Sequence, residues 1–315
     1  MTGSRDDIDV LVSEVGPRDG LQNESAMVSV DDKVAFIDLL SAAGCPVIEA
    51  GAFVSPRWIP QMADTADVFA RISKRPGTRY TALVPNVEGL NRAQAAGVTE
   101  VAIFAAASET FSRKNINKDI DASLAGYRDV CGRARELGIE VRAYLSTAFG
   151  CPFEGHIEPL SVARVAGALI EMGAFEVAVS DTIGIAHPGQ VPAVVTAVAE
   201  RVPLHKLALH FHDTRGTALA NVLAALDLGV MTFDASAGGL GGCPYAPGAT
   251  GNLATEDLLY MLDGLGVETG IALDGVVAAT RFMSARVGHA PASRYFAAVH
   301  ASGSSTRPDD RRSSS

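Results

Sequence analysis

Lys206-Leu207-Ala208-Leu209-His210-Phe211-His212 is a short apolar run that ends in two histidines. The run predicts a strand, and because successive strand side chains point to opposite faces, His210 and His212 share one face. Two imidazoles on one face at a strand end form half of a metal site. An isolated His-x-His motif is equally often a pair of ordinary polar residues in a turn, so the rest of the chain has to decide.

Similar apolar runs recur about every thirty to forty residues, separated by amphipathic stretches, and this alternation predicts repeated βα units. The predicted strands are 10–14, 47–51, 80–84, 100–104, 140–145, 176–180, 206–212 and 231–235. Helical patterns lie between them, at 31–43, 90–96, 120–137, 160–172, 188–202 and 218–228. Glycines follow several of these patterns at expected helix stops, namely Gly44, Gly97, Gly138, Gly173 and Gly229.

The number of βα units favours a single-domain (β/α)8 TIM barrel, and 315 residues with 48% hydrophobic content supply its core. A doubly wound open sheet is the alternative, but no glycine-rich phosphate-binding turn follows the first predicted strand. We expect the barrel at 8–301, after an N-terminal extension at 1–7 and before a disordered tail at 302–315.

Composition excludes several classes of partner. The formal net charge is -10 and no basic stripe is present, which argues against nucleic acid. The four cysteines are scattered, which favours a reducing compartment over a disulfide framework. No apolar signal segment or membrane-spanning stretch occurs, so we expect a cytoplasmic protein without a membrane partner.

Polar residues stand at the C-terminal ends of several predicted strands, where barrel enzymes carry their chemistry. The first strand runs into Glu14-Val15-Gly16-Pro17-Arg18-Asp19-Gly20, the second carries Glu49 and the fifth carries Tyr144. Asp181 follows the sixth strand, where it would by itself be an ordinary capping residue. The agreement of several strands on one end favours an active site.

Two imidazoles need a carboxylate to approach charge balance around a divalent cation, and Asp19 is within reach because strand one lies near strand seven in a closed barrel. An amide oxygen from Asn252 is a reasonable fourth ligand. Such a mixed nitrogen and oxygen set with open positions suits Mg²⁺ or Mn²⁺, whereas structural zinc prefers sulfur. Arg18 is either a surface ion-pair partner of Glu14 or Asp19, or a fixed cation for a developing oxyanion.

A long loop at 235–252 contains six glycines and two prolines, a composition typical of active-site lids. Cys243 lies at its centre. From the loop alone, this cysteine is either a mobile acid/base group or a spare thiol, and its thiol matters only if it is partly exposed and tuned.

Several motifs together resemble the 3-hydroxy-3-methylglutaryl-CoA (HMG-CoA) lyase family over about residues 8 to 285. The opening motif is Glu14-Val15-Gly16-Pro17-Arg18-Asp19-Gly20-Leu21-Gln22-Asn23-Glu24, and the lid motif is Gly239-Leu240-Gly241-Gly242-Cys243-Pro244-Tyr245-Ala246. The lid motif is the more specific, because a wider group of metal-dependent TIM-barrel lyases and synthases shares Arg-Asp and His-x-His. Further matches lie at 53–62, 114–117, 150–155, 181–184, 210–213 and 251–257.

The resemblance implies a lyase that splits HMG-CoA into acetyl-CoA and acetoacetate, as in leucine degradation, with an acyl-CoA substrate and a homodimeric assembly. It implies the metal ligands Asp19, His210, His212 and Asn252. It implies catalytic roles for Arg18, Asp19, Cys243, His210, Glu49 and Asp181. The implied contacts to substrate and coenzyme A are Lys114, Asn115, Gln22 and Tyr144.

Three positions depart from the family's usual residues. Arg215 stands where Tyr is frequent, Ser180 where Gly is frequent, and Ala178 where Ser is common. These positions lie near the ends of strands six and seven, so a related substrate with a larger C3 substituent is an alternative. Arg215 would otherwise pair with Asp213 and leave the specificity unchanged.

Two other functions compete with this interpretation. A Claisen-type acyl-CoA synthase or a 4-hydroxy-2-oxo acid aldolase would use the same scaffold, but the Cys243 loop argues against both. A synthase would also usually carry a regulatory domain, for which residues 286–315 leave no room. A non-catalytic metal-binding scaffold is the second competitor, and retention of the whole set of site residues argues against it.

Overall fold

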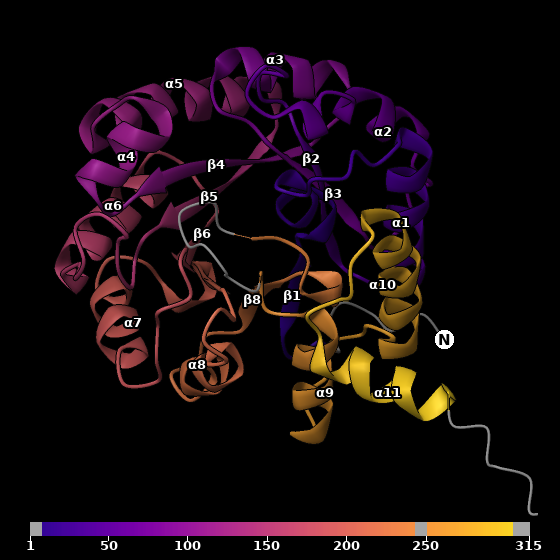
Figure 1. Ribbon diagram of the computed structural model, residues 1–315. Coiled ribbons are helices and arrows are strands. Elements are labelled where there is room, and N and C mark those ends of the chain that lie inside the picture. Colours follow the sequence, from indigo (N-terminus) through magenta and orange to yellow (C-terminus); the bar gives the residue numbers. More distant parts are fainter. Residues whose placement is uncertain (1–7, 243–250, 305–315) are drawn as a thin grey trace, which may run out of the picture.

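The computed structural model describes residues 8–242 and 251–304. Eight parallel strands close into a barrel in sequence order, with β1 hydrogen-bonded to both β2 and β8 (Figure 1). This confirms the predicted TIM barrel and excludes the open doubly wound sheet. The strands are β1 (Leu11–Glu14), β2 (Val47–Ala52), β3 (Arg79–Leu83), β4 (Glu100–Ala106), β5 (Glu140–Ser146), β6 (Glu176–Asp181), β7 (Leu207–Phe211) and β8 (Thr232–Ala235).

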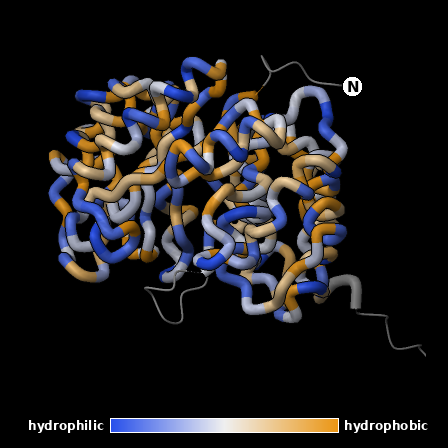
Figure 2. The backbone as a smooth tube through the Cα atoms, turned by 90° about the horizontal axis from the view of Figure 1, so that it is seen from above, coloured by the Kyte–Doolittle hydropathy of each residue, from blue (hydrophilic) through white to orange (hydrophobic). Residues whose placement is uncertain are grey.

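Helices surround the barrel as an outer ring, and hydrophobic and hydrophilic positions alternate along them (Figures 1 and 2). Helices α2, α4, α9, α10 and α11 were not among the predicted ones. The helices are α1 (Val30–Ala42), α2 (Thr65–Arg71), α3 (Val87–Ala95), α4 (Glu109–Ile116), α5 (Ile120–Leu137), α6 (Pro159–Glu171), α7 (Val191–Ala199), α8 (Ala218–Leu226), α9 (Thr255–Gly264), α10 (Leu273–Val287) and α11 (Arg294–Ser304).

Helix ends follow local chemistry. Gly44, Gly97, Gly138, Gly173 and Gly229 all have positive φ, as expected of glycines that end helices. Helix α3 begins three residues before the predicted 90–96, because the Asn86 side chain accepts a hydrogen bond from Gly89 N at 2.9 Å and caps the helix.

Helix α11 continues to Ser304, into the stretch that we expected to be a disordered tail. Among the described residues, no helix combines the length and the apolar character needed to cross a membrane.

Two irregular turns at the C-terminal mouth of the barrel position the polar residues. A π-helical turn, η2 (Gly16–Gly20), follows β1 and carries Arg18 and Asp19. A short helix, η5 (Ala237–Gly239), follows β8. The part of the predicted lid at 243–250, Cys243 included, lies outside the described residues.

The segment that contains Asn252 is inserted between the ends of β7 and β8. Leu253 N donates to Phe211 O at 3.0 Å, and Ser236 N donates to Leu253 O at 2.9 Å. Asn252 forms an antiparallel bridge with His212. This backbone pairing brings Asn252 beside His210 and His212, although Asn252 lies 40 residues after His212 in the chain.

Two buried glutamates hold the turn η5. Glu14 accepts a hydrogen bond from Ala237 N at 2.9 Å, and Glu256 accepts one from Gly238 N at 2.9 Å. Burial raises the pKa of each carboxyl to about 7, against hydrogen bonds that lower it. Both groups therefore bind a proton more tightly in the folded protein than in the unfolded chain.

We expect these two glutamates to contribute stability to the metal-free protein that is lost as the pH rises from about 4.5 to about 7, because the unfolded glutamates ionise near 4.5 and the folded ones near 7. Glu256→Gln removes one of these groups and should flatten the dependence. Melting temperatures of wild type and Glu256→Gln between pH 5 and pH 8, with chelator present, measure the difference. Equal pH dependence in both proteins would contradict the raised pKa of Glu256.

Candidate active site

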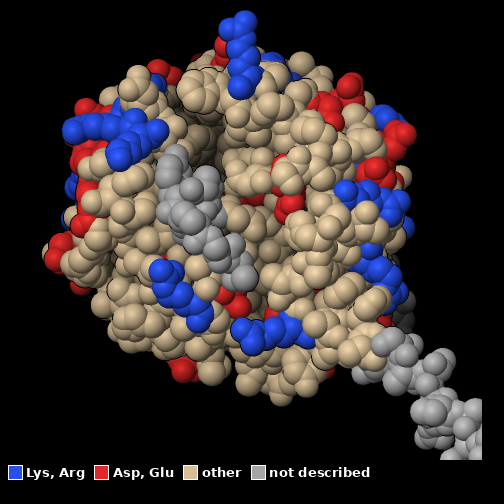
Figure 3. Space-filling model, in the orientation of Figure 1, with Lys and Arg blue, Asp and Glu red and all other residues tan. Residues whose placement is uncertain are grey.

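Asp19, His210 and His212 meet at the mouth of the barrel. Each offers one ligand atom, and these atoms lie within 4.8 Å of one another. The rings of His210 and His212 have centroids 5.2 Å apart, as expected from their i, i+2 spacing on β7 and its extension. Figure 3 shows a hollow in this face with acidic atoms inside it.

Asn252 completes the donor set. Its amide nitrogen donates to Asp19 Oδ2 at 2.9 Å and to Leu240 O at 3.0 Å. Its buried Oδ1, like Nδ1 of His212, has no hydrogen-bond partner among the described residues. A buried polar atom without a partner costs about 1–3 kcal/mol, so such atoms point to an absent ligand. One carboxylate, two imidazoles and an amide oxygen fit a divalent cation.

The charges of these groups favour cation binding. Burial and then the neighbouring His210 lower the pKa of His212 to about 4, which keeps its ring neutral. Burial alone would raise the pKa of Asp19, but Arg18 and the two histidines outweigh it and leave that pKa below its usual value. A neutral imidazole and an ionised carboxylate are the forms that coordinate metals.

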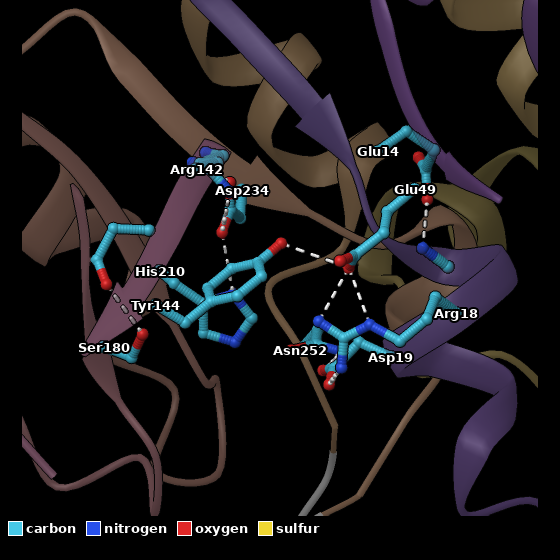
Figure 4. Close-up of polar contacts among 12 residues, drawn as sticks. Glu14, Arg18, Asp19, Glu49, Arg142, Tyr144, Ser180, His210, Asp234 and Asn252 are labelled. Atoms are coloured by element: carbon cyan, nitrogen blue, oxygen red, sulfur yellow. Dashed lines mark hydrogen bonds and ion pairs between the residues drawn. The ribbon is translucent and has the colours of Figure 1, made fainter. Parts of the chain in front are cut away.

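A buried chain of charged residues fixes the ring of His210 (Figure 4). Its Nδ1 lies 3.1 Å from Asp234 Oδ2, in the middle of β8. Asp234 Oδ1 in turn accepts from Arg142 Nη2 at 2.8 Å, and Arg142 Nε donates to Glu176 Oε1 at 2.6 Å. With Nδ1 protonated toward Asp234, Nε2 of His210 is left free to bind a metal.

The sequence analysis missed Asp234 and Arg142. Both were placed inside predicted strands and were not assigned a function. A charged residue in an otherwise apolar strand is the signal that would have marked them, since charges are seldom fully buried without a partner.

Arg18 joins the metal site to a second group of polar side chains. Its guanidinium donates to Glu49 Oε2 through Nε at 2.7 Å and to Asp19 Oδ1 through Nη1 at 2.6 Å. The Tyr144 hydroxyl donates to the same Glu49 oxygen at 3.1 Å. The expected ion pair with Asp19 therefore forms, but the Arg18 side chain is only 7% exposed, so the pair is not a surface pair. Glu14, the other expected partner, bonds elsewhere.

The family of the chain follows from comparison with known proteins. The HMGL-like family model matches residues 9–283. The chain belongs to the HMGL-like family.

Relatives in this family are similar over most of their length. The mitochondrial hydroxymethylglutaryl-CoA lyase of Bos taurus is 53% identical over 274 residues, which cover 87% of this chain and 84% of the relative. A 3-hydroxy-3-isohexenylglutaryl-CoA/hydroxy-methylglutaryl-CoA lyase of Pseudomonas aeruginosa is 51% identical over 285 residues, covering 90% of this chain and 95% of the relative.

Solved structures of the family superpose closely. The crystal structure of hydroxymethylglutaryl-CoA lyase from Pseudomonas aeruginosa has a TM-score of 0.92 and 50% identity, and covers 93% of this chain and 98% of that one. An HMG-CoA lyase from Acinetobacter baumannii, solved with coenzyme A and 3-methylmalate, has a TM-score of 0.88 and 37% identity, with coverage of 99% and 100%.

The remaining residues that the HMGL-like resemblance implied lie apart from the metal-site contacts described above. Both carboxylate oxygens of Asp181 accept hydrogen bonds at 3.0 Å from the backbone of the following loop, from Ile185 N and Ala186 N. Burial raises the pKa of Asp181 to about 6. In this arrangement Asp181 supports the loop after β6, but it caps no helix, because the next helix, α7, begins at Val191.

The candidate coenzyme A contacts are more exposed. Lys114 and Asn115 lie on the outer face of α4, where Lys114 Nζ is 3.9 Å from the centre of the Phe153 ring. Gln22 is half-buried, two residues beyond η2. Arg215 is exposed and donates through Nη1 to Gly184 O at 2.8 Å and to Ile183 O at 3.0 Å.

Proposed function

We propose that this chain is a metal-dependent carbon–carbon lyase that cleaves HMG-CoA to acetyl-CoA and acetoacetate. The observation that carries the proposal is the meeting of Asp19, His210 and His212 beside the buried Arg18–Glu49 pair. Relatives named as HMG-CoA lyases are about half identical to this chain, and one solved relative holds coenzyme A. An acyl-CoA substrate follows from the same likeness.

We infer that Asp19, His210, His212 and Asn252 hold Mg²⁺ or Mn²⁺, because these ions accept mixed nitrogen and oxygen ligands and retain open positions. A bound divalent ion makes a substrate hydroxyl easier to ionise and polarises a neighbouring carboxylate. Zinc in a closed structural site would prefer cysteine ligands, and among the described residues no cysteine belongs to this cluster.

Asp19 or an adjacent water accepts the proton of the C3 hydroxyl in the proposed reaction. The electron pair of that O–H bond forms the new ketone, and the C2–C3 bond breaks. The electron pair of the broken bond passes to C2 and onto the thioester oxygen. One proton leaves the hydroxyl and one is added to C2, so the products balance the substrate without an added oxidant or reductant.

Arg18 stabilises the negative charge that develops on the thioester oxygen. Guanidinium has five N–H donors, and its bonds to Glu49 and Asp19 leave others for the substrate. Glu49 and Tyr144 orient Arg18, and the ring of Tyr144 lies 5.3 Å from the guanidinium carbon. The proposed donor of the proton to C2 is Cys243, which lies outside the described residues, or a water activated by the metal.

Acetoacetate release from HMG-CoA tests the proposal directly. We expect turnover with Mg²⁺ or Mn²⁺, loss of turnover with a chelator, and recovery when metal is added back. Thiol release from acetyl-CoA plus pyruvate is the control for a synthase, and cleavage of a 4-hydroxy-2-oxo acid is the control for an aldolase. Activity in either control assay, with no acetoacetate from HMG-CoA, would overturn the assignment.

A lyase for larger 3-hydroxy-3-alkylglutaryl thioesters is the second candidate. Ala178 and Ser180 are small residues on one face of β6, and Ser180 is in register with His210. The Pseudomonas relative is named for both an isohexenyl and a methyl substrate. We infer that small side chains next to His210 favour a longer substituent at C3 of the substrate.

We expect Ser180→Leu to lower kcat/KM for a long-chain thioester more than for HMG-CoA, by about tenfold or more. A panel of 3-alkyl thioesters assayed with wild type and variant gives the ratio. Equal losses on all substrates would show that Ser180 does not limit the length of the substituent.

We propose a homodimer in the cytoplasm, without nucleic-acid or membrane partners. Relatives are named as mitochondrial in some cases and as cytoplasmic in others. Light scattering on the purified chain measures the oligomeric state, and a monomeric mass would contradict the dimer.

A further inference from the structure

Glu14 is a fully buried carboxylate at the end of β1 that the proposed reaction does not use. Its Oε1 accepts hydrogen bonds from Gly16 N at 2.8 Å and Ala237 N at 2.9 Å. Its Oε2 accepts one from Thr255 Oγ1 at 2.7 Å. One side chain therefore contacts three segments that are far apart in the sequence.

Two of these segments carry metal-site residues. Gly16 opens η2, which carries Arg18 and Asp19. Thr255 lies three residues after Asn252 and begins α9. We propose that Glu14 is a positioning residue that fixes the Arg18–Asp19 turn relative to the Asn252 segment; this rests on the proposed function of the site.

The backbone holds each segment to its own strand. In η2, the N–H groups of Arg18, Asp19 and Gly20 all donate to Val15 O, directly after β1. The Asn252 segment pairs with β7 and with the residue after β8, as described above. The Glu14–Thr255 hydrogen bond joins these two units a second time, beside the direct hydrogen bond from Asn252 Nδ2 to Asp19 Oδ2. It therefore supports the distance between the two halves of the donor set from outside the ligand atoms.

Packing around Glu14 leaves little room for an alternative arrangement. A Cβ added at Gly16 would lie 2.6 Å from Glu14 Oε1, so the turn approaches the carboxylate as closely as a glycine allows. A Cβ added at Gly20 would lie 2.9 Å from Ser236 Oγ and from Leu240 Cβ. If the Glu14 carboxylate moved, η2 would therefore have to move with it, because closely packed groups transmit small displacements to their neighbours.

Thr255→Val tests the proposal because it deletes the hydroxyl that donates a hydrogen bond to Glu14 Oε2 and keeps the shape of the side chain. Glu14→Asp keeps the charge but withdraws the carboxylate by one methylene. We expect each variant to weaken Mn²⁺ binding, measured by electron paramagnetic resonance of free Mn²⁺, by about tenfold or more. The KM for metal in the acetoacetate assay should rise in parallel, with kcat largely recovered at saturating Mn²⁺.

Two variants serve as controls. Glu14→Gln can still accept both N–H groups through its amide oxygen and donate its amide nitrogen to Thr255 Oγ1, so Mn²⁺ affinity should stay within about threefold of wild type. Thr280→Val removes the hydroxyl that bonds to Glu256, the other buried glutamate, without touching η2 or Asn252. This variant should lower the melting temperature and leave Mn²⁺ affinity unchanged.

A purely structural role for Glu14 would lower the melting temperature of Thr255→Val and Glu14→Asp but leave Mn²⁺ affinity at the wild-type value, and that result overturns the proposal. If Glu14→Asp does not fold, Thr255→Val decides alone. Mn²⁺ affinity is read without substrate, so wild-type protein that fails to cleave HMG-CoA refutes the proposed function and not the positioning role.

Discussion

We expect Arg18→Met to lower the turnover of HMG-CoA by at least about 10²–10³-fold, the usual cost of removing a well-placed oxyanion donor. The physical reason is that Arg18 is 6% exposed and held by Glu49 and Asp19, so its charge acts where little water screens it. Acetoacetate release at saturating substrate and metal measures the loss.

Stability has to be followed beside turnover in this variant. Removing one partner of a buried ion pair leaves the other uncompensated, and Glu49 already has a raised pKa because of burial. Glu49 can take up a proton when Arg18 is lost, which limits the destabilisation. The melting temperature and the Mn²⁺ affinity of Arg18→Met show whether the variant is folded and binds metal, so that a loss of turnover is not mistaken for a loss of folding.

Arg18→Lys is the matched variant, because lysine keeps the charge but lacks the planar fork that binds Glu49 and Asp19 together. We expect it to recover only part of the turnover. Near wild-type turnover of folded, metal-saturated Arg18→Met would reject a role for this residue in stabilising the enolate.

We expect Asp234→Asn to weaken Mn²⁺ binding by about 10–100-fold, the usual effect of changing the partner of a metal-binding histidine. An asparagine oxygen can still accept from His210 Nδ1, but its amide nitrogen then faces the guanidinium of Arg142, a donor against a donor. To avoid this contact, either the His210 ring or the Arg142 guanidinium has to move from its position beside residue 234. Mn²⁺ titration of the metal-free protein measures the affinity, and kcat should recover at high Mn²⁺.

Glu176→Gln is the control for this prediction. Glu176 bonds to the opposite side of Arg142, through Nε at 2.6 Å, and does not bond to His210. We expect its Mn²⁺ affinity to stay within about threefold of wild type, with a lower melting temperature. Equal affinities in Asp234→Asn and wild type would show that Asp234 does not orient the histidine.

Local patterns in the sequence predicted the barrel correctly. Each strand coincides with a short apolar run in the sequence. The glycines after five helices adopt the left-handed backbone conformation that ends a helix. Strand periodicity also placed His210 and His212 on one face. Helices α2, α4, α9, α10 and α11 were missed, because they lie outside the six helical patterns read from the sequence and their place is decided by packing on the barrel.

The sequence alone determined where the strands lie along the chain and which residue types could serve as ligands. Both depend on residue type and on near neighbours in the sequence. The tertiary structure alone decided which charges meet. Asp234 reaches Arg142 across 92 residues of chain, and Glu14 reaches Thr255 across 241. Such contacts arise only when the barrel closes and brings segments that are distant in the sequence together, and no local pattern encodes that proximity.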